Sequence, residues 1–309
     1  MARNLFLWLS ERRGIFNFVK RHRLARRIAS RFVAGETIDS GIRAARALND
    51  RGISVSLDLL GESVASSDET VAARDEVIKT LNAVADGGVN GNVSVKLTQL
   101  GLDIDNELCT ENMRRILSRA AEQDTFVRID MEGSNYTERT LRIFENLYPT
   151  FGKQTGVVIQ SYLRRSAQDV DKLISMKARV RLCKGAYAEP ASVAFQDKRE
   201  VRASYISLME RLLDDGNYPA IATHDEKLIR HAIDFVKRKN IPVERFEFQM
   251  LFGVRRDLQH QLRNKGFNMR VYIPFGSNWY PYLMRRLAER SSNVAFMATS
   301  LVKETLSRR

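Results

Sequence analysis

The sequence predicts an α/β fold, a (βα)8 TIM-like barrel with an N-terminal helical extension. Eight short runs rich in β-branched and aromatic residues recur along the chain, charged amphipathic segments separate them, and most runs carry a polar residue near the C-terminal end. Repeated alternation of strand and helix favours a parallel sheet, and eight such units can close on themselves. The length of 309 residues suits one barrel with additions.

The first 51 residues are predicted to form the helical extension. Apolar residues from Phe16 to Phe32 keep roughly helical spacing, and Gly35 and Gly52 break the pattern. The Arg-rich start also suits a transit peptide, but its apolar patch at residues 5–9 is too short for a signal sequence or a membrane span. We therefore divide the chain into an extension, residues 1–51, and a barrel, residues 52–309.

The strands and helices of the barrel follow from two different periodicities. The predicted strands are residues 53–60, 93–97, 126–131, 157–161, 180–183, 220–223, 246–251 and 269–273. Segments long enough for crossover helices are residues 73–88, 111–123, 137–148, 167–177, 201–216 and 226–240. An open doubly wound sheet is the alternative, but the first strand carries no GxGxxG phosphate fingerprint, because the local sequence is DLLGESVASS. The barrel is preferred.

Composition argues against several functional classes. The net charge of +13 would suit a nucleic-acid-binding protein, but the basic residues are dispersed among acidic ones, so we expect no nucleic-acid partner. The four histidines show no metal-binding spacing, and no metal is predicted. The sequence contains no GxSxG motif, so a hydrolase with a nucleophilic serine is not predicted. Two cysteines are too few for a disulfide framework, which favours a cytoplasmic protein.

Polar residues at the ends of the predicted strands indicate a functional site. Strands of a parallel sheet that serve structure alone should be continuous apolar runs. The polar residues here are Glu62, Lys96, Asp130, Gln160, Arg181 with Lys184, Thr223 with His224, and Tyr272. In a barrel these positions converge on one mouth, where active sites are built. A mouth rich in lysine and arginine can hold an anionic substrate and an anionic redox cofactor.

The C-terminal segment, residues 271–293, contains a candidate carboxylate clamp. On a helix that begins near Asn278, Arg285 and Arg286 lie four and three residues before Glu289. Glu289 can orient one guanidinium, and the pair offers more donors than this single carboxylate needs. Two adjacent guanidinium groups can therefore bind a substrate carboxylate in a bidentate manner.

This C-terminal motif resembles the last strand and helix of proline dehydrogenases, the flavoenzyme domain that also occurs in bifunctional proline utilisation proteins. Further segments agree with the family in the same order, from about residue 53 to the end of the chain: SLDLLGE at 56–62, VSVKLTQLG at 93–101, VRIDME at 127–132, VVIQSYLRRS at 157–166, VRLCKGAY at 180–187, IATHD at 221–225 and FEFQMLFGV at 246–254. Ordered motifs at consistent spacing are more specific than any one of them.

The resemblance implies oxidation of L-proline to 1-pyrroline-5-carboxylate, the first step of proline catabolism, by hydride transfer to flavin N5 of FAD inside a distorted barrel. Another cyclic imino acid, such as hydroxyproline, is the alternative substrate. The residues that match the family's flavin contacts are Met131, Gln160, Arg181, Lys184, Gly185, Ala186, Thr223 and His224. Ala188 and Glu189 depart from the family pattern beside this set.

The resemblance also implies roles around the substrate. Lys96, Arg285 and Arg286 match the groups that hold the proline carboxylate, and Glu289 supports the arginines. Tyr272 and Leu251 would pack on the pyrrolidine ring. Asp130 and Arg181 match the catalytic pair that shapes the environment of flavin N5. The base that accepts the proton of the substrate amine is not identified.

The partners implied are a quinone or other membrane electron acceptor and a separate pyrroline-5-carboxylate dehydrogenase that acts downstream. Residues 3–31 combine aromatic and aliphatic side chains with many arginines, a composition typical of a basic interfacial helix. Peripheral binding at the inner face of the membrane is therefore expected. The competing interpretation is that this segment packs on the barrel with its arginines in water.

Overall fold

The computed structural model describes residues 30–61 and 64–288. Its strands are β1 (Ser54–Leu59), β2 (Gly91–Val95), β3 (Val127–Ile129), β4 (Thr155–Gln160), β5 (Arg179–Cys183), β6 (Ala220–Ala222), β7 (Glu247–Leu251) and β8 (Met269–Phe275). Its helices are α4 (Ile38–Asn49), α5 (Ser67–Asp86), η1 (Thr98–Leu100), α6 (Asn106–Glu122), α7 (Ser134–Phe151), α8 (Ser166–Ser175), α9 (Lys198–Asp215), α10 (Glu226–Arg238), η2 (Val243–Arg245), α11 (Arg256–Asn264) and α12 (Trp279–Ala288).

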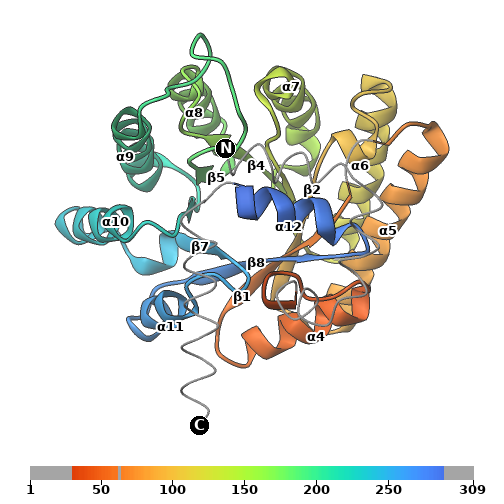
Figure 1. The fold of residues 1–309 in the computed structure, drawn as a ribbon, viewed down its shortest axis with the longest axis horizontal. Helices are drawn as coiled ribbons and strands as arrows, with labels where there is room; N and C mark the ends of the chain where they lie inside the picture. The colour runs from red at the N-terminus through yellow and green to blue at the C-terminus, as the bar shows by residue number, and fades with distance from the viewer. Residues whose placement is uncertain (1–29, 62–63, 289–309) are drawn as a thin grey trace.

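The strands form a closed parallel barrel in the order β1 to β8, with β8 pairing back to β1 (Figure 1). This confirms the predicted (βα)8 fold. The predicted domain boundary at residue 52 falls between α4 and β1, and residues 1–29 of the predicted extension lie outside the described residues.

Side chains along each strand alternate between two different environments. The outward-facing ones are apolar and pack beneath the helices, as Leu57, Val93 and Ile129 do in the main hydrophobic core. Many inward-facing ones are polar, and Ser56 and Arg181 are examples that are almost fully buried. TIM barrels are usually filled by branched aliphatic residues, so this polar interior is a departure that must be satisfied by internal hydrogen bonds.

Local sequence signals begin the helices that cover the barrel. Thr37 and Ser40 form a capping box at the start of α4, and the Ser66 hydroxyl accepts a hydrogen bond from the backbone N–H of Glu69 at the start of α5. Asp197 and Asp225 serve as N-caps of α9 and α10 in the same way. Each cap fixes the point at which the chain leaves the barrel mouth.

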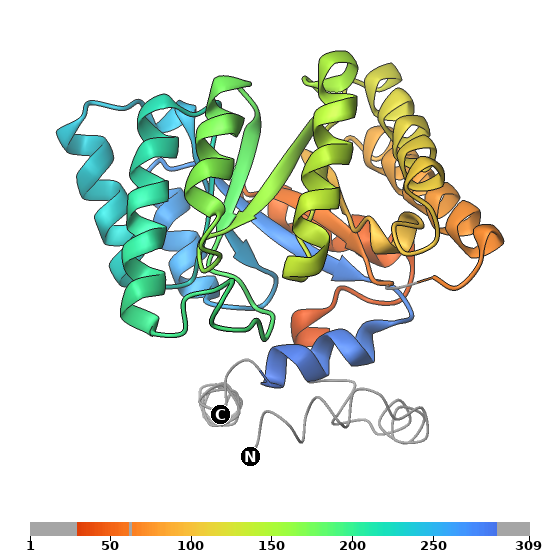
Figure 2. The same cartoon turned by 90° about the horizontal axis from the view of Figure 1, so that it is seen from above.

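The last helix distorts the barrel from its ideal form. In Figure 1, α12 crosses the open end of the barrel, and Figure 2 shows it beyond the ends of the strands and not among the outer helices. Its Trp279, Tyr280 and Leu283 form a separate apolar cluster with Val33 and Leu60. The position beside β8 and β1 on the outside of the barrel is taken by α4. The helix therefore closes over the mouth where the strand-end polar residues gather.

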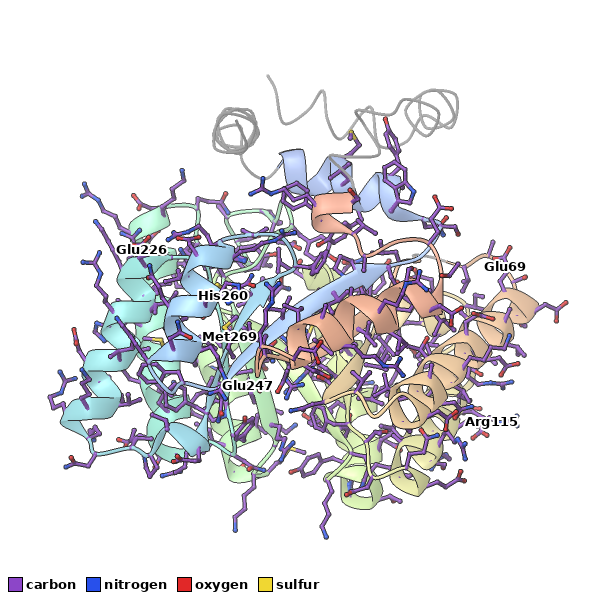
Figure 3. All side chains as sticks on the ribbon, turned by 90° about the horizontal axis from the view of Figure 1, so that it is seen from below. Glu69, Arg115, Glu226, Glu247, His260 and Met269 are labelled. Carbon is purple, nitrogen blue, oxygen red and sulfur yellow. The ribbon has the colours of Figure 1, made fainter. Side chains whose placement is uncertain are left out.

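An ion-pair network fills the opposite end of the barrel. Glu247 is almost fully buried and pairs with Arg270 at 2.9 Å, while Arg270 also donates to the Asn92 side chain at 3.1 Å. Arg128 is buried nearby and donates to the backbone oxygen of Arg179 at 2.6 Å. Figure 3 shows Glu247 on the side of the barrel away from α12. This floor lies apart from the mouth and serves stability.

Candidate active site

Asp130 lies just after β3 and contacts side chains from three other parts of the barrel. Its Oδ1 accepts a hydrogen bond from Arg181 Nη1 at 2.7 Å, and its Oδ2 accepts one from the Tyr272 hydroxyl at 2.7 Å. The Lys96 ammonium lies 3.8 Å from Oδ2. Because the Asp130 side chain is only 12% exposed, these contacts form largely out of water. Both of its carboxylate oxygens are engaged.

Arg181 is held from several sides in the middle of β5. Besides Asp130, it donates through Nη2 to the Ser94 hydroxyl at 3.1 Å and to the Ser56 hydroxyl at 3.3 Å. Its guanidinium carbon lies 5.2 Å from the centre of the Tyr272 ring. The guanidinium therefore has little freedom to change its orientation. Its buried Nε has no hydrogen-bond partner among the described residues.

Tyr272 reaches into the barrel from the middle of β8 and not from its end. Burial, and then the carboxylates of Asp130 and Asp58, raise the pKa of its phenol well above the usual range. The hydroxyl therefore remains protonated and donates to Asp130. Its predicted packing against a substrate ring stays a prediction.

Lys96 follows β2 and forms an ion pair with Asp58 of β1 at 2.8 Å. The Asp58 side chain is 2% exposed and that of Lys96 is 14% exposed. With Asp130 and Arg181, these groups form the mouth cluster, which we define as Asp58, Lys96, Asp130, Arg181 and Tyr272. The mouth cluster brings together four of the sequence-predicted residues and one that was given no role.

A second set of contacts fixes Gln160 at the end of β4. Its side-chain amide donates to the backbone oxygen of Glu132 at 2.8 Å. Glu132 in turn accepts hydrogen bonds from the backbone N–H and hydroxyl of Thr98, at 3.2 and 2.7 Å. Gln160 is 3% exposed, and Met131, which precedes Glu132, is also buried. The amide of Gln160 is thus oriented before any ligand binds.

Asp225 brings together the predicted residues that follow β5 and β6, Lys184 and Thr223. Lys184 pairs with Asp225 at 2.7 Å, and Arg202 approaches the same carboxylate at 3.3 Å. The Thr223 hydroxyl accepts a hydrogen bond from the backbone N–H of Asp225 at 3.1 Å. Although burial alone would raise the pKa of Asp225, Lys184 and Arg202 lower it. The carboxylate therefore remains ionised between the two cations.

His224 fixes the end of the next strand. Its Nε2 accepts a hydrogen bond from the backbone N–H of Leu251, at 3.0 Å. That bond requires the other ring nitrogen to carry the proton in the neutral form. Leu251 is half-buried at the end of β7. Both predicted residues therefore lie at the mouth, as the strand order requires.

Gly185 has a structural reason to be glycine. Its φ is +109°, and a Cβ at this position would lie 2.2 Å from the ring of Tyr162. Ala186, which follows it, is exposed. The chain then runs as a loop to Asp197, and backbone hydrogen bonds join Val193 to Arg164 at 2.9 Å and Phe195 to Tyr162 at 2.8 Å. We call residues 184–197 the β5 loop.

Part of the predicted clamp can be placed only by its backbone. Arg285 and Arg286 lie in the last turns of α12, over the mouth, and the structure does not describe their side chains. Glu289 and Glu62 lie outside the described residues. The predicted helix start near Asn278 is confirmed, because α12 begins at Trp279.

Asp58, Ser56 and Ser94 were missed as site residues. Asp58 interrupts the apolar run ISVSLDLL and is two residues from Ser56, so both side chains point to the same face of the strand. A carboxylate inside an apolar strand was therefore the available signal. Asp225, which accepts a hydrogen bond from Lys184, ends the motif IATHD but was likewise given no role.

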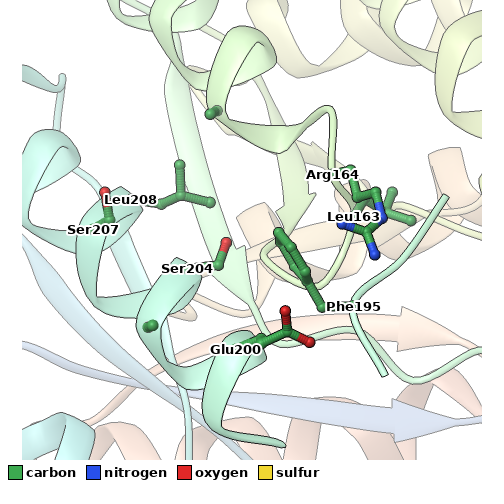
Figure 4. A pocket seen from close by; sticks show the side chains of 9 residues that line it. Leu163, Arg164, Phe195, Glu200, Ser204, Ser207 and Leu208 are labelled. Atoms are coloured by element: carbon green, nitrogen blue, oxygen red, sulfur yellow. The ribbon is translucent and has the colours of Figure 1, made fainter. Parts of the chain in front are cut away.

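A surface pocket of about 410 Å³ lies away from this cluster, between the β5 loop and α8 and α9 (Figure 4). Phe195, Leu163 and Leu208 supply apolar lining, and Glu200 and Ser204 supply polar groups. None of the mouth cluster lines it. The convergence of charged groups at the barrel mouth therefore marks the active site better than this hollow does.

Comparison with known proteins identifies the family. The profile described as proline dehydrogenase matches residues 41–299. The chain belongs to the proline dehydrogenase family. Proline dehydrogenase 1 of Bacillus subtilis is 42% identical over 98% of this chain and 100% of its own length. Proline dehydrogenase of Deinococcus radiodurans is 43% identical over 89% of this chain and 90% of its own.

A solved structure of a family member agrees with the fold. Proline utilization A from Bdellovibrio bacteriovorus, inactivated by N-propargylglycine, superposes with a TM-score of 0.81 at 27% identity, over 85% of this chain and 32% of that one. The reaction of the proline dehydrogenase family is the flavin-dependent oxidation of proline to 1-pyrroline-5-carboxylate, and this chain is an enzyme of that kind.

The part of the chain that the structure describes shows neither a metal-binding cluster nor a membrane-spanning helix. No cluster of histidine, cysteine, aspartate and glutamate there could hold a metal ion. Within the same residues, every helix is too short or too polar to cross a bilayer.

Proposed function

We propose that the flavin with which this proline dehydrogenase oxidises L-proline is FAD, and that the mouth cluster and α12 form the binding site. The observation that carries the proposal is the buried group of Lys96, Asp130, Arg181 and Tyr272. These side chains come from strands whose C-terminal ends form the open end of the barrel that α12 crosses (Figure 1). Such an arrangement provides fixed cations for an anionic substrate beside polar groups for a cofactor.

The residues present fit a flavin. The buried Nε of Arg181 has no hydrogen-bond partner among the described residues and can donate to a ligand. Lys184 and Arg202 supply positive charge for phosphate groups, and both are already oriented by Asp225. The residues that would hold FAD are Met131, Gln160, Arg181, Lys184, Gly185, Ala186, Thr223 and His224. When bound, the flavin supplies a two-electron acceptor for the substrate hydride.

The substrate would be held by charge at one end and by shape at the other. Lys96, Arg285 and Arg286 bind the proline carboxylate in this proposal, and Glu289 orients the arginines. Tyr272 and Leu251 would pack against the apolar pyrrolidine ring of the substrate. Fixing the carboxylate leaves one orientation for the ring carbon that is oxidised, which is the entropic part of catalysis.

Asp130 and Arg181 are the proposed catalytic pair. Arg181 presents a fixed guanidinium to negative charge that develops next to it during the reaction. The Asp130 carboxylate accepts a hydrogen bond from that guanidinium and another from the Tyr272 hydroxyl, both at 2.7 Å. Because Asp130 is engaged by both donors, its contribution is to orient them.

The flavin test uses the purified protein. We expect it to be yellow, to bleach when L-proline is added without oxygen, and to release FAD into the supernatant after acid precipitation. Slower bleaching with hydroxyproline than with proline would support proline as the substrate. A colourless protein that FAD cannot reconstitute would end this proposal.

The electron acceptor is proposed to be a membrane quinone, with a separate dehydrogenase acting on the product. The predicted interfacial helix spans residues 3–31, and residues 3–29 of it lie outside the described residues. Each basic residue near an anionic surface contributes about 1 kcal/mol, attenuated by salt. Full-length protein should therefore sediment with anionic vesicles at low salt, and protein that lacks residues 1–34 should not. Equal sedimentation of both would contradict this proposal.

A further inference from the structure

We propose that Asp58 is a positioning residue that keeps the Lys96 ammonium charged and aimed at the substrate carboxylate. The inference rests on the proposed function, in which Lys96 binds that carboxylate. Asp58 is not among the predicted site residues. Its proposed role follows from the register of β1 and β2 and from its ion pair with Lys96.

The barrel register places the two groups side by side. Asp58 of β1 is paired with Ser94 of β2, and Lys96 lies two residues beyond Ser94 on the same face. The resulting ion pair has an Nζ to Oδ1 distance of 2.8 Å. Asp58 is 1% exposed, so water cannot replace this contact. A lysine on a flexible four-carbon stem is thereby fixed in direction.

The carboxylates of Asp58 and Asp130 have different hydrogen-bond partners. Asp130 lies 3.8 Å from Lys96, but both of its oxygens already accept hydrogen bonds from Arg181 and Tyr272. Asp58 Oδ1 accepts from Lys96, and its buried Oδ2 has no partner among the described residues. Lys96 therefore depends on Asp58 for its closest negative charge, while Asp130 serves the other two groups.

The balance of forces on Lys96 favours the charged form. Burial lowers the pKa of Lys96, but the carboxylate of Asp58 and then that of Asp130 raise it above its ordinary value. Tyr187 also acts on this ammonium, and Arg181 and Tyr272 lie around Asp130. The folded protein therefore favours the ammonium form of Lys96, which suits an anion-binding role.

Removal of the Asp58 charge reverses the balance. In an Asp58→Asn variant the burial of Lys96 persists while its closest carboxylate is lost, so the pKa of Lys96 falls. The ammonium then loses its proton as the pH rises, and carboxylate binding weakens at alkaline pH. A role of Asp58 in packing alone would lower stability without this dependence on pH.

The test measures binding of cyclopentanecarboxylate, a ring carboxylate without a titrating amine, to the flavin-loaded enzyme by calorimetry. Wild-type affinity should be flat from about pH 7 to about pH 10, whereas Asp58→Asn should lose roughly 10-fold or more across that range. Asp58→Glu, which keeps the charge, should restore most of the alkaline affinity. A loss of affinity that is equal in Asp58→Glu and Asp58→Asn and does not change with pH would assign the residue to packing and overturn the proposal.

Two controls separate charge from folding. In a Lys96→Arg background the guanidinium does not titrate, so Asp58→Asn should add no alkaline loss. Glu247→Gln breaks a similarly buried ion pair at the barrel floor and should lower the melting temperature without changing the pH profile. Alkaline loss of equal size in the Lys96→Arg background would contradict the proposal.

The proposed function can fail independently of this inference. A wild-type enzyme that neither binds cyclopentanecarboxylate nor oxidises proline would contradict the substrate assignment. Wild-type turnover together with flat, wild-type affinity in Asp58→Asn would overturn the role of Asp58 alone.

Discussion

Asp130 contacts Arg181, Tyr272 and Lys96, which come from three separate parts of the barrel. Removal of a carboxylate with several charged or polar partners frees them all at once. Hydrogen bonds to charged groups contribute about 1.5 to 3 kcal/mol each, and each 1.4 kcal/mol is a factor of 10. The consequence should appear in the chemical step, because Arg181 would no longer be held in one orientation.

Asp130→Ala should therefore slow flavin reduction by proline about 10- to 100-fold while retaining most of the flavin. The flavin is expected to remain because Lys184, Gln160 and Thr223 lie outside this contact set. Anaerobic stopped-flow absorbance measures the reduction rate, and the flavin-to-protein ratio measures retention. Equal reduction rates in the variant and the parent would leave Asp130 a structural role only.

At the residue scale, the sequence predicted that Asp130, Arg181 and Lys96 share the barrel mouth, but it gave Asp58 no role. Polar residues mark the ends of the predicted strands, and Glu62 is the one that follows the first strand. Asp58 lies one residue before the end of β1, and only alternation along the strand indicates that it faces inward. The partner that it meets depends on the stagger between β1 and β2, which a single sequence does not encode locally.

At the scale of elements, the alternation of strands and helices was predictable because its two periodicities differ clearly. The position of α12 was not. Its apolar residues indicate that one face must be buried, but they do not say against which neighbour. Val33 and Leu60, far away in the sequence, supply that neighbour at the barrel mouth. Long-range packing therefore decides where the clamp-bearing helix lies.

The β5 loop is held at its middle by Glu189. Gly133, the N-cap of α7, offers no side chain to the helix, and Glu189 instead accepts hydrogen bonds from the backbone N–H of Ser134 at 2.7 Å and from its hydroxyl. A carboxylate at a helix N-terminus is favourable to the helix dipole. The same contact ties the loop that begins at Lys184 to the barrel wall.

Glu189→Ala should thus loosen the β5 loop and weaken flavin retention several-fold, with about 0.5 to 2 kcal/mol lost from stability. Flavin fluorescence on dilution measures the release rate, and thermal denaturation measures the stability. Glu111→Ala, which removes an exposed glutamate beyond the first turn of α6, is the control and should change neither. If both variants release flavin at the parental rate, the contact serves α7 alone.

For the whole molecule, the buried charges separate into a mouth and a floor. At the floor, burial raises the pKa of Glu247. Arg270, Gln249 and Arg128 together lower that pKa by more than burial raises it, so it lies below its ordinary value. Burial and the nearby Arg181 lower the pKa of Arg128. Glu247 is therefore the carboxylate that offsets the guanidinium groups packed inside this end of the barrel.

Glu247→Gln should consequently destabilise the protein by about 3 to 5 kcal/mol near pH 7, because Arg270 and Arg128 lose their buried counter-charge. The sign of the pH dependence follows from the lowered pKa in the folded state. The stabilisation by Glu247 is fully present above its unfolded pKa, about 4.3, and is lost as the pH falls through the lower folded value. The gap between variant and parent should therefore narrow with acid.

Urea denaturation from about pH 7 down to about pH 3 measures this gap. Glu111→Gln, which removes an exposed ion pair with Arg115 on α6, should leave stability nearly unchanged over the same range. A Glu247→Gln gap that stays constant with pH would mean that the glutamate stabilises the floor by its hydrogen bonds and packing. A gap that closes in acid assigns the effect to its charge, at an end of the barrel remote from the chemistry.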